Sequence, residues 1–509
     1  MPSGAGIGLW FVAAVLWLTA CASSSPQPEP PEATEPDLSK VSSFVLANAR
    51  LVDLSGDAPQ IRENAFLLIE DGQITAIGDA ASDFVADAVI ELGGQTVTPG
   101  LSDMHVHIWD EAELGAYLSY GVTTVRNLSG MPFHLVLQDE IARGERVGPR
   151  LLTSGPILNS SGPNEQANHQ LVEDADAARA AVAWQADAGF TRLKVYSNLT
   201  RDAYEAALAE ARARGMSVTG HSPEGVRGLG VPTSQPFEIA FEDILEDGFE
   251  TLEHIETIAW HGLRGRKGEN AARKLARQIA AAGVPVTTTR VAHHNLLRMA
   301  ESDGDAAKRS GMDLLNPFVQ AIEAAEQARW AEADPAPLRK DDAFQARLTK
   351  IFAEEGVTLV AGSDAGIFIN APGQSLGDEL GLLVDAGLSP YEALRAATWN
   401  AALALGESET AGCVQSGCAA DLVVYACDPL ADIDCVRSPS GVVRDGRWFS
   451  QRRLLELREA ARLHDTERTQ ANLFEGLAAQ GTPVPDLWAA FFQANRTESL
   501  ACGGNALAR

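Results

Sequence analysis

The strongest constraint on the fold is a repeated alternation of short β-rich runs with helical stretches in the middle of the chain. Strand-like runs recur between residues 96 and 364, and stretches such as residues 176–189 and 201–215 are typical of helices that end in glycine. This alternation predicts an α/β fold in which helices cover parallel strands. We count eight such units and therefore expect a (β/α)8 TIM barrel over residues 98–399, with an enlarged loop between strands seven and eight.

Two stretches of alternating apolar and polar residues flank the expected barrel, at residues 44–97 and 400–450. Each contains an Asp-Gly hairpin signal, at residues 71–72 and 445–446. We expect both ends of the core to join in one small β-sandwich. Residues 451–509 are predicted to form a helical C-terminal extension, with helices near 451–463 and 486–496 that pack on the barrel.

The acidic composition excludes one class of partner. The 509 residues include 40 lysines and arginines against 69 aspartates and glutamates, a formal net charge of -29. Nucleic acid is therefore not expected as a partner, because neutralising phosphates requires clustered cations. Oligomeric state stays open, and a homo-oligomer is compatible with the composition.

The N-terminal 21 residues are predicted to be a lipoprotein signal segment. An apolar run at residues 7–20 is short for a bilayer span, and residues 18–21 (LTAC) resemble a bacterial lipobox. Cys21 would then carry the lipid, and residues 22–43, rich in Pro, Glu and Ser, would be a tether. We expect an extracytoplasmic protein lipid-anchored to a bacterial membrane, with the periplasmic face of the outer membrane favoured; a buried or uncleaved helix stays open.

Cysteine spacing supports an oxidising compartment. Four cysteines lie close together at positions 413, 418, 427 and 435, which allows two disulfides and three pairings. We prefer Cys413 with Cys418 and Cys427 with Cys435, which leaves Cys502 over. Structural zinc is the poorer interpretation, because the spacings lack a C-x-x-C pair.

Chemistry-bearing residues stand where the predicted strands end. His105 and His107 lie two apart on the first barrel strand, so both imidazoles share one face and can hold one metal ion. Active sites of TIM barrels form at the carboxyl ends of the strands. Four further residues occupy such ends, on strands four, five, six and eight: Lys194, His221, His254 and Asp364.

The motifs TPGLSDMHVH, GVTTVRNL, KVY, GHS, EHIE, GSDAG and ADLVVY together resemble the amidohydrolase superfamily over residues 44–450. The resemblance is to binuclear members related to imidazolonepropionase-like and prolidase-like hydrolases. It implies two divalent metal ions and a lysine carboxylated by carbon dioxide. The implied ligands are His105, His107 and Asp364 on the more buried ion, His221 and His254 on the more exposed one, and Lys194 bridging both.

This ligand set has a consistent chemistry. Burial lowers the pKa of a lysine, and the neutral amine can react with carbon dioxide to give an anionic ligand. Zn²⁺ suits the nitrogen-rich set best, with Mn²⁺ and Co²⁺ left open. A hydroxide bridging two ions would attack a polarised carbonyl. Asp364 would act as general base and then acid, or as a ligand only, and Tyr196 would stabilise the oxyanion or merely pack.

Several further residues have two interpretations each. His169, His293 and His294 are placed in loops after strands three and seven, where they would contact substrate or simply face solvent. Arg126 would bind a substrate carboxylate or form a structural ion pair. Asn127 stands where many relatives carry aspartate, so no role is assigned to it.

The expected function is hydrolysis of a carbon-nitrogen amide bond in a dipeptide, an N-acyl amino acid or a cyclic amide, so the partner is a small molecule. Deaminase relatives use a mononuclear site without the strand-four lysine, so Lys194 argues against that chemistry. Two alternatives stay open: lactonase, esterase or phosphotriesterase chemistry at the same centre, and a non-catalytic binding lipoprotein stabilised by metal.

Overall fold

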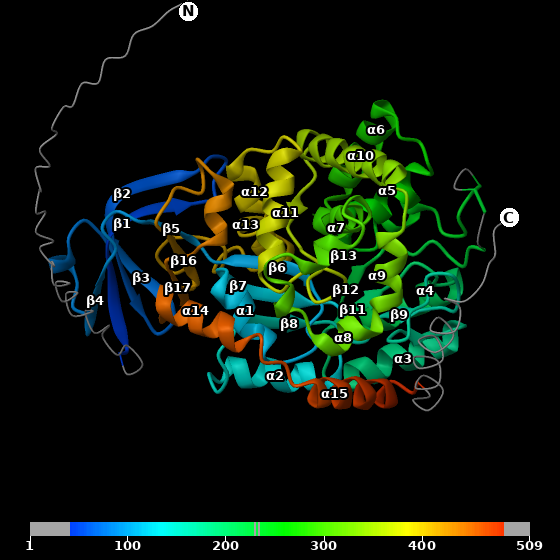
Figure 1. Cartoon of the computed structure of the whole chain (residues 1–509), viewed down its shortest axis with the longest axis horizontal. Helices are drawn as coiled ribbons and strands as arrows, with labels where there is room; N and C mark the ends of the chain where they lie inside the picture. Colours follow the sequence, from blue (N-terminus) through cyan, green and yellow to red (C-terminus); the bar gives the residue numbers. More distant parts are fainter. Residues whose placement is uncertain (1–40, 229–230, 233–234, 483–509) are drawn as a thin grey trace, which may run out of the picture. The chain divides into compact units, whose positions relative to one another are not determined.

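The computed structural model describes residues 41–482 except residues 229–230 and 233–234 (Figure 1). The predicted signal segment with Cys21, nearly all of the tether, the helix expected at 486–496 and Cys502 lie outside the described residues. Among the helices of the described part, none is both long enough and apolar enough to cross a membrane.

The middle of the chain forms parallel strands that follow the predicted order. They hydrogen-bond in two groups, β6-β7-β8 and β9-β11-β12-β13-β14-β15, with β10 beside β9. The strands are β6 (Leu101–Val106), β7 (Val122–Asn127), β8 (Arg150–Thr153), β9 (Leu158–Asn159), β10 (Gln170–Leu171), β11 (Arg192–Val195), β12 (Ser217–Gly220), β13 (Phe249–Glu253), β14 (Val286–Thr287) and β15 (Leu359–Val360).

Backbone hydrogen bonds link the two groups on both sides. The amide of Gly155, just after β8, donates to the carbonyl oxygen of Arg192 at 2.9 Å. On the other side the amide of Asp364, beyond β15, donates to the carbonyl oxygen of His105 at 2.8 Å. The parallel strands therefore form a curled sheet, and their carboxyl ends share one rim.

Helices connect successive strands and cover the sheet (Figure 1). Local sequence sets where they begin: the side chains of Asp174 and Thr200 cap α3 and α4 by accepting hydrogen bonds from the backbone amides of Ala177 and Ala203. The helices up to β15 are α1 (Glu113–Ser119), α2 (Pro132–Ala142), α3 (Ala175–Asp187), α4 (Arg201–Ala213), α5 (Ile255–Leu263), α6 (Glu269–Ala282), α7 (Arg290–Glu301), α8 (Pro317–Ile322), α9 (Ala324–Ala331) and α10 (Pro335–Glu354). The enlarged connection expected between strands seven and eight is thus a helical insertion of α7 to α10.

Both ends of the core meet in one hydrogen-bonded β sheet, in the order β18-β17-β16-β5-β1-β2-β3 with β4 beside β1. The first part of β1 pairs with β4 and a later part with β5, so this strand joins the two halves of the sheet. Its strands are β1 (Ser43–Asp53), β2 (Gln60–Glu70), β3 (Gln73–Gly78), β4 (Ala88–Glu91), β5 (Thr96–Pro99), β16 (Leu422–Tyr425), β17 (Gly441–Arg444) and β18 (Arg447–Ser450).

Two disulfides lie in or beside this β domain, Cys413–Cys418 and Cys427–Cys435. The preferred pairing is therefore confirmed. Cys413 and Cys418 are buried in the apolar cluster that holds β1, β2 and β16 together. The bridge closes a short segment that also pairs with β3, because the amide of Ile74 donates to the carbonyl of Cys418 and the amide of Gly417 donates to the carbonyl of Ile74.

After β15 the chain continues through α11 (Gln374–Asp385), α12 (Pro390–Ala396) and α13 (Trp399–Ala404) to the second half of the β domain. Beyond β18 it forms α14 (Gln451–Ala460) and α15 (Thr466–Ala479). The first of these matches the helix expected near 451–463. The second lies within the helical extension expected over 451–509, although no individual helix was expected at these residues, and its Leu473 and Leu477 pack on Met131 at the start of α2.

Candidate metal centre

Three side chains, from the first and the last of the parallel strands, form the centre of the site. His105 is the last residue but one of β6, His107 directly follows this strand, and Asp364 lies beyond β15; the ligand atoms of all three lie within 4.8 Å of one another. Nε2 of His107 is 3.0 Å from Oδ1 of Asp364, and Nε2 of His105 is 3.4 Å from the same oxygen. All three residues are buried, so the group is shielded from bulk water.

Asp364 is held as a carboxylate. Burial by itself raises its pKa, but the hydrogen bond from His107 and the fields of His105, His107 and His254 outweigh burial and hold the pKa far below its usual range. The charged form is therefore kept although the residue is buried.

Lys194 reaches the same group from β11. Its Nζ lies 3.3 Å from Nε2 of His105, and the side chain is 1% exposed. Burial lowers the pKa of this amine to about 8, against the opposing fields of Glu253 and Asp364. About a tenth of the amine, far more than for an ordinary lysine, is therefore in the neutral form that reacts with carbon dioxide at pH 7.

His254 and His221 continue the site as a row of imidazoles. The ring centroids of His105 and His254 are 4.4 Å apart, and those of His254 and His221 are also 4.4 Å apart. The burial of both rings lowers their pKa values, that of His254 to about 4, so the imidazoles are neutral and can donate a lone pair. The structure thus brings all six predicted side chains to one place.

Hydrogen bonds orient these imidazoles through their Nδ1 atoms. Nδ1 of His105 donates to Oε2 of Glu253 at 2.7 Å, which leaves Nε2 as the lone-pair atom. Thr257 donates its hydroxyl to Glu256 and can accept from Nδ1 of His221 at 3.5 Å. Nδ1 of His254 lies 2.6 Å from the Thr289 hydroxyl oxygen. Partners of this kind around a set of histidines are typical of metal-binding sites.

Glu253 is the residue that the sequence interpretation missed. It is fully buried at the end of β13 and contacts His105 with one carboxylate oxygen. Its other oxygen accepts from Nη2 of Arg126 at 2.8 Å, and the same guanidinium pairs with Glu250 at 2.8 Å. Arg126 is therefore a structural ion-pair partner, and the alternative that it binds a substrate carboxylate is wrong. The sequence signal that could have identified Glu253 is its position directly before His254.

The donor set fits divalent metal ions of the transition series. Neutral imidazole nitrogens, a carboxylate and a buried amine with a lowered pKa face one another, and imidazole with carboxylate is the ligation that zinc and its neighbours prefer. Only His105, His107 and Asp364 form a close group of at least three ligand side chains among the described residues. A second ion beside His221 and His254 would need the modified Lys194.

A family model for the amidohydrolase family matches residues 96–449. The chain belongs to the amidohydrolase family. This match spans both the curled sheet and the part of the β domain contributed by the C-terminal half, so fold and site fall within one family assignment. The expectation of an enzyme that hydrolyses carbon-nitrogen bonds agrees with this membership.

Individual relatives of this amidohydrolase-family chain are distant. It is 28% identical to the L-hydantoinase of Paenarthrobacter aurescens over 144 residues, which are 26% of this chain and 30% of that protein. The chain thus spans less than a third of the length of that curated relative. A bottromycin amidohydrolase structure has a TM-score of 0.64 at 24% identity, covering 84% of this chain and 92% of the other.

A Xaa-Pro dipeptidase structure with bound methionine has a TM-score of 0.61 at 20% identity, covering 80% of this chain and 100% of that one. At such identities the likeness to solved structures establishes the fold alone. Substrate and mechanism must therefore be argued from the residues of this chain.

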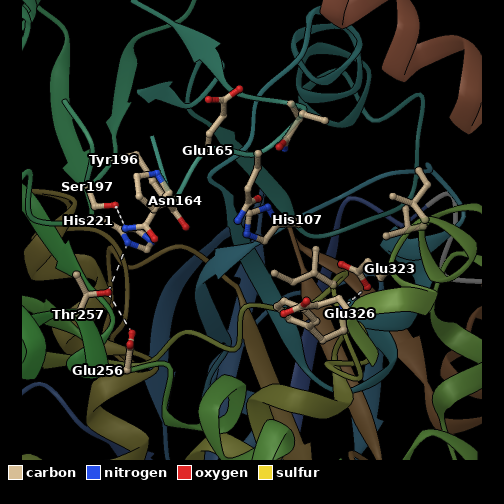
Figure 2. A pocket seen from close by; sticks show the side chains of 18 of the residues that line it. His107, Asn164, Glu165, Tyr196, Ser197, His221, Glu256, Thr257, Glu323 and Glu326 are labelled. Carbon is tan, nitrogen blue, oxygen red and sulfur yellow. Dashed lines mark hydrogen bonds between the residues drawn. The ribbon is translucent and has the colours of Figure 1, made fainter. Parts of the chain in front are cut away.

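The centre of this amidohydrolase-family protein opens into a cavity of about 830 Å³, a size typical of small-molecule sites. Figure 2 shows His107 between two groups of lining side chains, with His221, Thr257 and Glu256 to one side and Glu323 and Glu326 to the other. Apolar lining comes from Trp109, Ile322, Leu473 and Leu477, which belong to one hydrophobic cluster.

The remaining histidine candidates are His169, which lies beside Tyr196, and His293 and His294, which lie on α7. His169 is 1% exposed, and its ring lies 4.6 Å from that of Tyr196, which in turn lies 3.9 Å from His221 and lines the cavity. His293 and His294 lie on α7 rather than in a loop, because the chain after β14 is helical, and His294 pairs with Asp342. Neither lines the cavity.

Asn127 has a structural role. Its amide group donates to Thr153 and its oxygen accepts the amide of Ile108, which holds the chain beyond β6 against β7.

Proposed function

We propose that this protein is a metal-dependent hydrolase of amide bonds, with a binuclear centre at the rim of a closed (β/α)8 barrel. The observation that carries the proposal is the set of hydrogen bonds that engage the Nδ1 atoms of His105, His221 and His254, while Lys194 and Asp364 lie against the opposite edge of the His105 ring. Residues that only filled the barrel would not need this common orientation.

The proposed ligands are those that the family resemblance implies: His105, His107 and Asp364 for one ion, His221 and His254 for the other, and carboxylated Lys194 between them. Two divalent ions, most suitably Zn²⁺, would supply Lewis acidity and hydroxide at neutral pH. The residues of the chain would supply the ligands and carry the protons. The buried amine of Lys194 is neutral enough to be carboxylated, which turns a repelled cation into an anionic ligand.

Asp364 is the proposed proton carrier. Its carboxylate is kept ionised by its histidine neighbours, so it can accept the proton of the attacking water and deliver it to the leaving nitrogen. Tyr196 lines the cavity next to His221 and burial raises its pKa, so its hydroxyl stays protonated and can donate to a developing oxyanion.

The substrate class is an amide: a dipeptide, an N-acyl amino acid or a cyclic amide. The direct test is turnover of a library of these three classes by the metal-loaded protein, with metal content measured in parallel. Lactones, esters and phosphotriesters belong in the same library. Preferential turnover of those classes would replace the amide assignment, and full occupancy by metal without turnover of any substrate would favour a binding protein.

Lys194→Ala is the variant that tests the binuclear part. We expect kcat/KM to fall by about a hundredfold or more and about one equivalent of metal to be lost, because the bridging ligand is gone. Lys308→Ala, which removes an exposed lysine that does not line the cavity, is the control. Undiminished activity of Lys194→Ala would contradict the proposal.

We further propose that the chain is a lipoprotein attached through Cys21 to a bacterial membrane and facing an extracytoplasmic compartment. The disulfides support an oxidising compartment. Fractionation of cells that produce the full chain should place it with membranes, and Cys21→Ser should release it. An unchanged distribution of Cys21→Ser would contradict the anchor.

A further inference from the structure

The charge of the cavity is unbalanced. Its lining includes one guanidinium, Arg329, whereas the carboxylates that line it are Glu165, Glu224, Glu256, Glu323 and Glu326. Arg329 pairs with Glu326 and its guanidinium lies over the Trp330 ring, so its charge is used within α9. No ion pair is formed by the other four carboxylates among residues 41–482 as far as the structure describes them.

Glu224 is the most telling of these carboxylates. The residue is only 5% exposed, yet among the described residues the one hydrogen-bond partner of its carboxylate is the indole nitrogen of Trp260, which donates to Oε2 at 2.8 Å. Arg227 is the cation whose field partly offsets the burial of Glu224, but its guanidinium donates to the backbone carbonyl oxygens of Pro232 and Gln235 and forms no ion pair with Glu224. A buried carboxylate without a cation costs free energy, and burial raises the pKa of Glu224 to about 7.

Glu256 faces the same part of the cavity. One of its oxygens accepts from Thr257, whose hydroxyl also lies 3.5 Å from His221, so this carboxylate stands one residue away from the proposed metal centre. It opens to the solvent of the cavity, and its electrostatic influence on Glu224 is repulsive. Trp260 lines the same cavity, is 43% exposed and has a ring able to pack against a cation.

We propose that Glu224, Glu256 and the Trp260 ring form a subsite for a cationic group of the substrate, such as the side chain of a lysine or arginine residue next to the scissile amide. That the bound group belongs to a substrate rests on the proposed function, whereas the subsite itself is argued from the cavity alone. A guanidinium or ammonium there would pair with two carboxylates that form no ion pair among the described residues, and Trp260 would shield the pair from water.

The test compares isosteres that differ in charge. Dipeptides carrying lysine or arginine at either position are compared with dipeptides carrying norleucine or citrulline at that position. We expect kcat/KM to favour the cationic member by about tenfold to a hundredfold, as one or two charge-assisted hydrogen bonds imply. In the double variant E224Q/E256Q this ratio should fall to about threefold or less. Glutamine preserves an acceptor for Trp260 and Thr257.

Glu326→Gln is the matched control, because this carboxylate lines the same cavity but is already neutralised by Arg329. Its preference for the cationic dipeptides should equal that of the unmodified protein. Circular dichroism of each variant checks folding, and where E224Q/E256Q fails to fold, the single variant E256Q is used, because that side chain is open to the cavity.

A binding measurement separates this inference from the proposed function. Free L-arginine and L-citrulline are titrated calorimetrically into the holoenzyme. Arginine binding that is lost in E224Q/E256Q, without turnover of any peptide, would support the subsite and overturn the proposed function. Turnover of dipeptides with equal preference for arginine and citrulline, together with equal binding of the two free amino acids, would overturn the subsite and leave the hydrolase.

Discussion

At the residue scale, the site depends on backbone conformations that ordinary strands do not have. His254 has φ 66° and Asp364 has φ 54°, both in the left-handed region that non-glycine residues seldom occupy. Adjacent residues of a regular strand point to opposite faces, but Glu253 and His254 both lie against His105. The turn at His254 is what permits this. Such conformations cost about 1–3 kcal/mol each and cluster at functional sites.

Replacing Glu253 tests the orientation of His105. In Glu253→Gln the charged partner of the imidazole is lost, so we expect the affinity for the more buried ion to fall by about tenfold to a hundredfold. Competition with a chelator, followed by metal analysis, measures the change. Glu250→Gln is the control, because Glu250 shares Arg126 but does not contact His105. Equal affinities of the two variants would show that Glu253 only neutralises the arginine.

At the scale of elements, α15 connects the C-terminal extension to the cavity. Arg468 on this helix binds Asp110 in two places, with Nη2 to Oδ1 at 2.7 Å and Nε to Oδ2 at 3.1 Å. Asp110 is fully buried and lies three residues beyond His107. Leu473 and Leu477 of the same helix line the cavity. The extension therefore forms part of the wall that a substrate would meet.

Arg468→Ala should weaken both the helix and the wall. The buried Asp110 carboxylate loses its charged partner, so we expect unfolding free energy to fall by about 1–3 kcal/mol. KM should rise more than kcat falls, because the displaced residues of the cavity wall would contact the substrate and take no part in the reaction. Urea denaturation and steady-state kinetics measure the two effects. Arg453→Ala, which removes an exposed pair within α14, should change stability by about 0.5 kcal/mol or less.

At the scale of the whole molecule, the β domain ties the two ends of the core together. β5 and β16 are antiparallel neighbours although more than 300 residues separate them along the chain. The segment between β16 and the preceding helix has few regular hydrogen bonds and carries the Cys413–Cys418 bridge, which is buried against β1 and β2. The disulfides thus stabilise the junction between barrel strands and β domain.

Opening this bridge should destabilise the protein measurably. In Cys413→Ser/Cys418→Ser we expect a loss of about 2 kcal/mol of unfolding free energy, near the low end for disulfides because the closed loop is short. Denaturation in urea at matched metal content gives the difference. Adding reductant to this variant should then reveal the separate effect of Cys427–Cys435, which closes a slightly longer loop. A midpoint equal to that of the unmodified protein would show that packing alone holds the junction.

The amino-acid sequence determined the features that depend on local periodicity. Alternating strands and helices with histidines, a lysine and an aspartate at strand ends placed six side chains on one rim, because parallel strands direct their carboxyl ends to the same side. Their metal-binding roles remain predictions. Cysteine spacing likewise indicated both disulfides, whose partners are close in sequence.

Only the tertiary structure decided what depends on contacts between distant segments. Glu253 meets His105 across 148 positions, and Arg468 meets Asp110 across 358. Neither contact leaves a periodic pattern in the sequence, since each is made by one side chain whose partner is set by how the curled sheet and α15 come together. The same holds for the unpaired carboxylates of the cavity. Their charge is visible in the sequence, whereas the lack of an ion pair at Glu224 within the described part of the chain is a property of the fold.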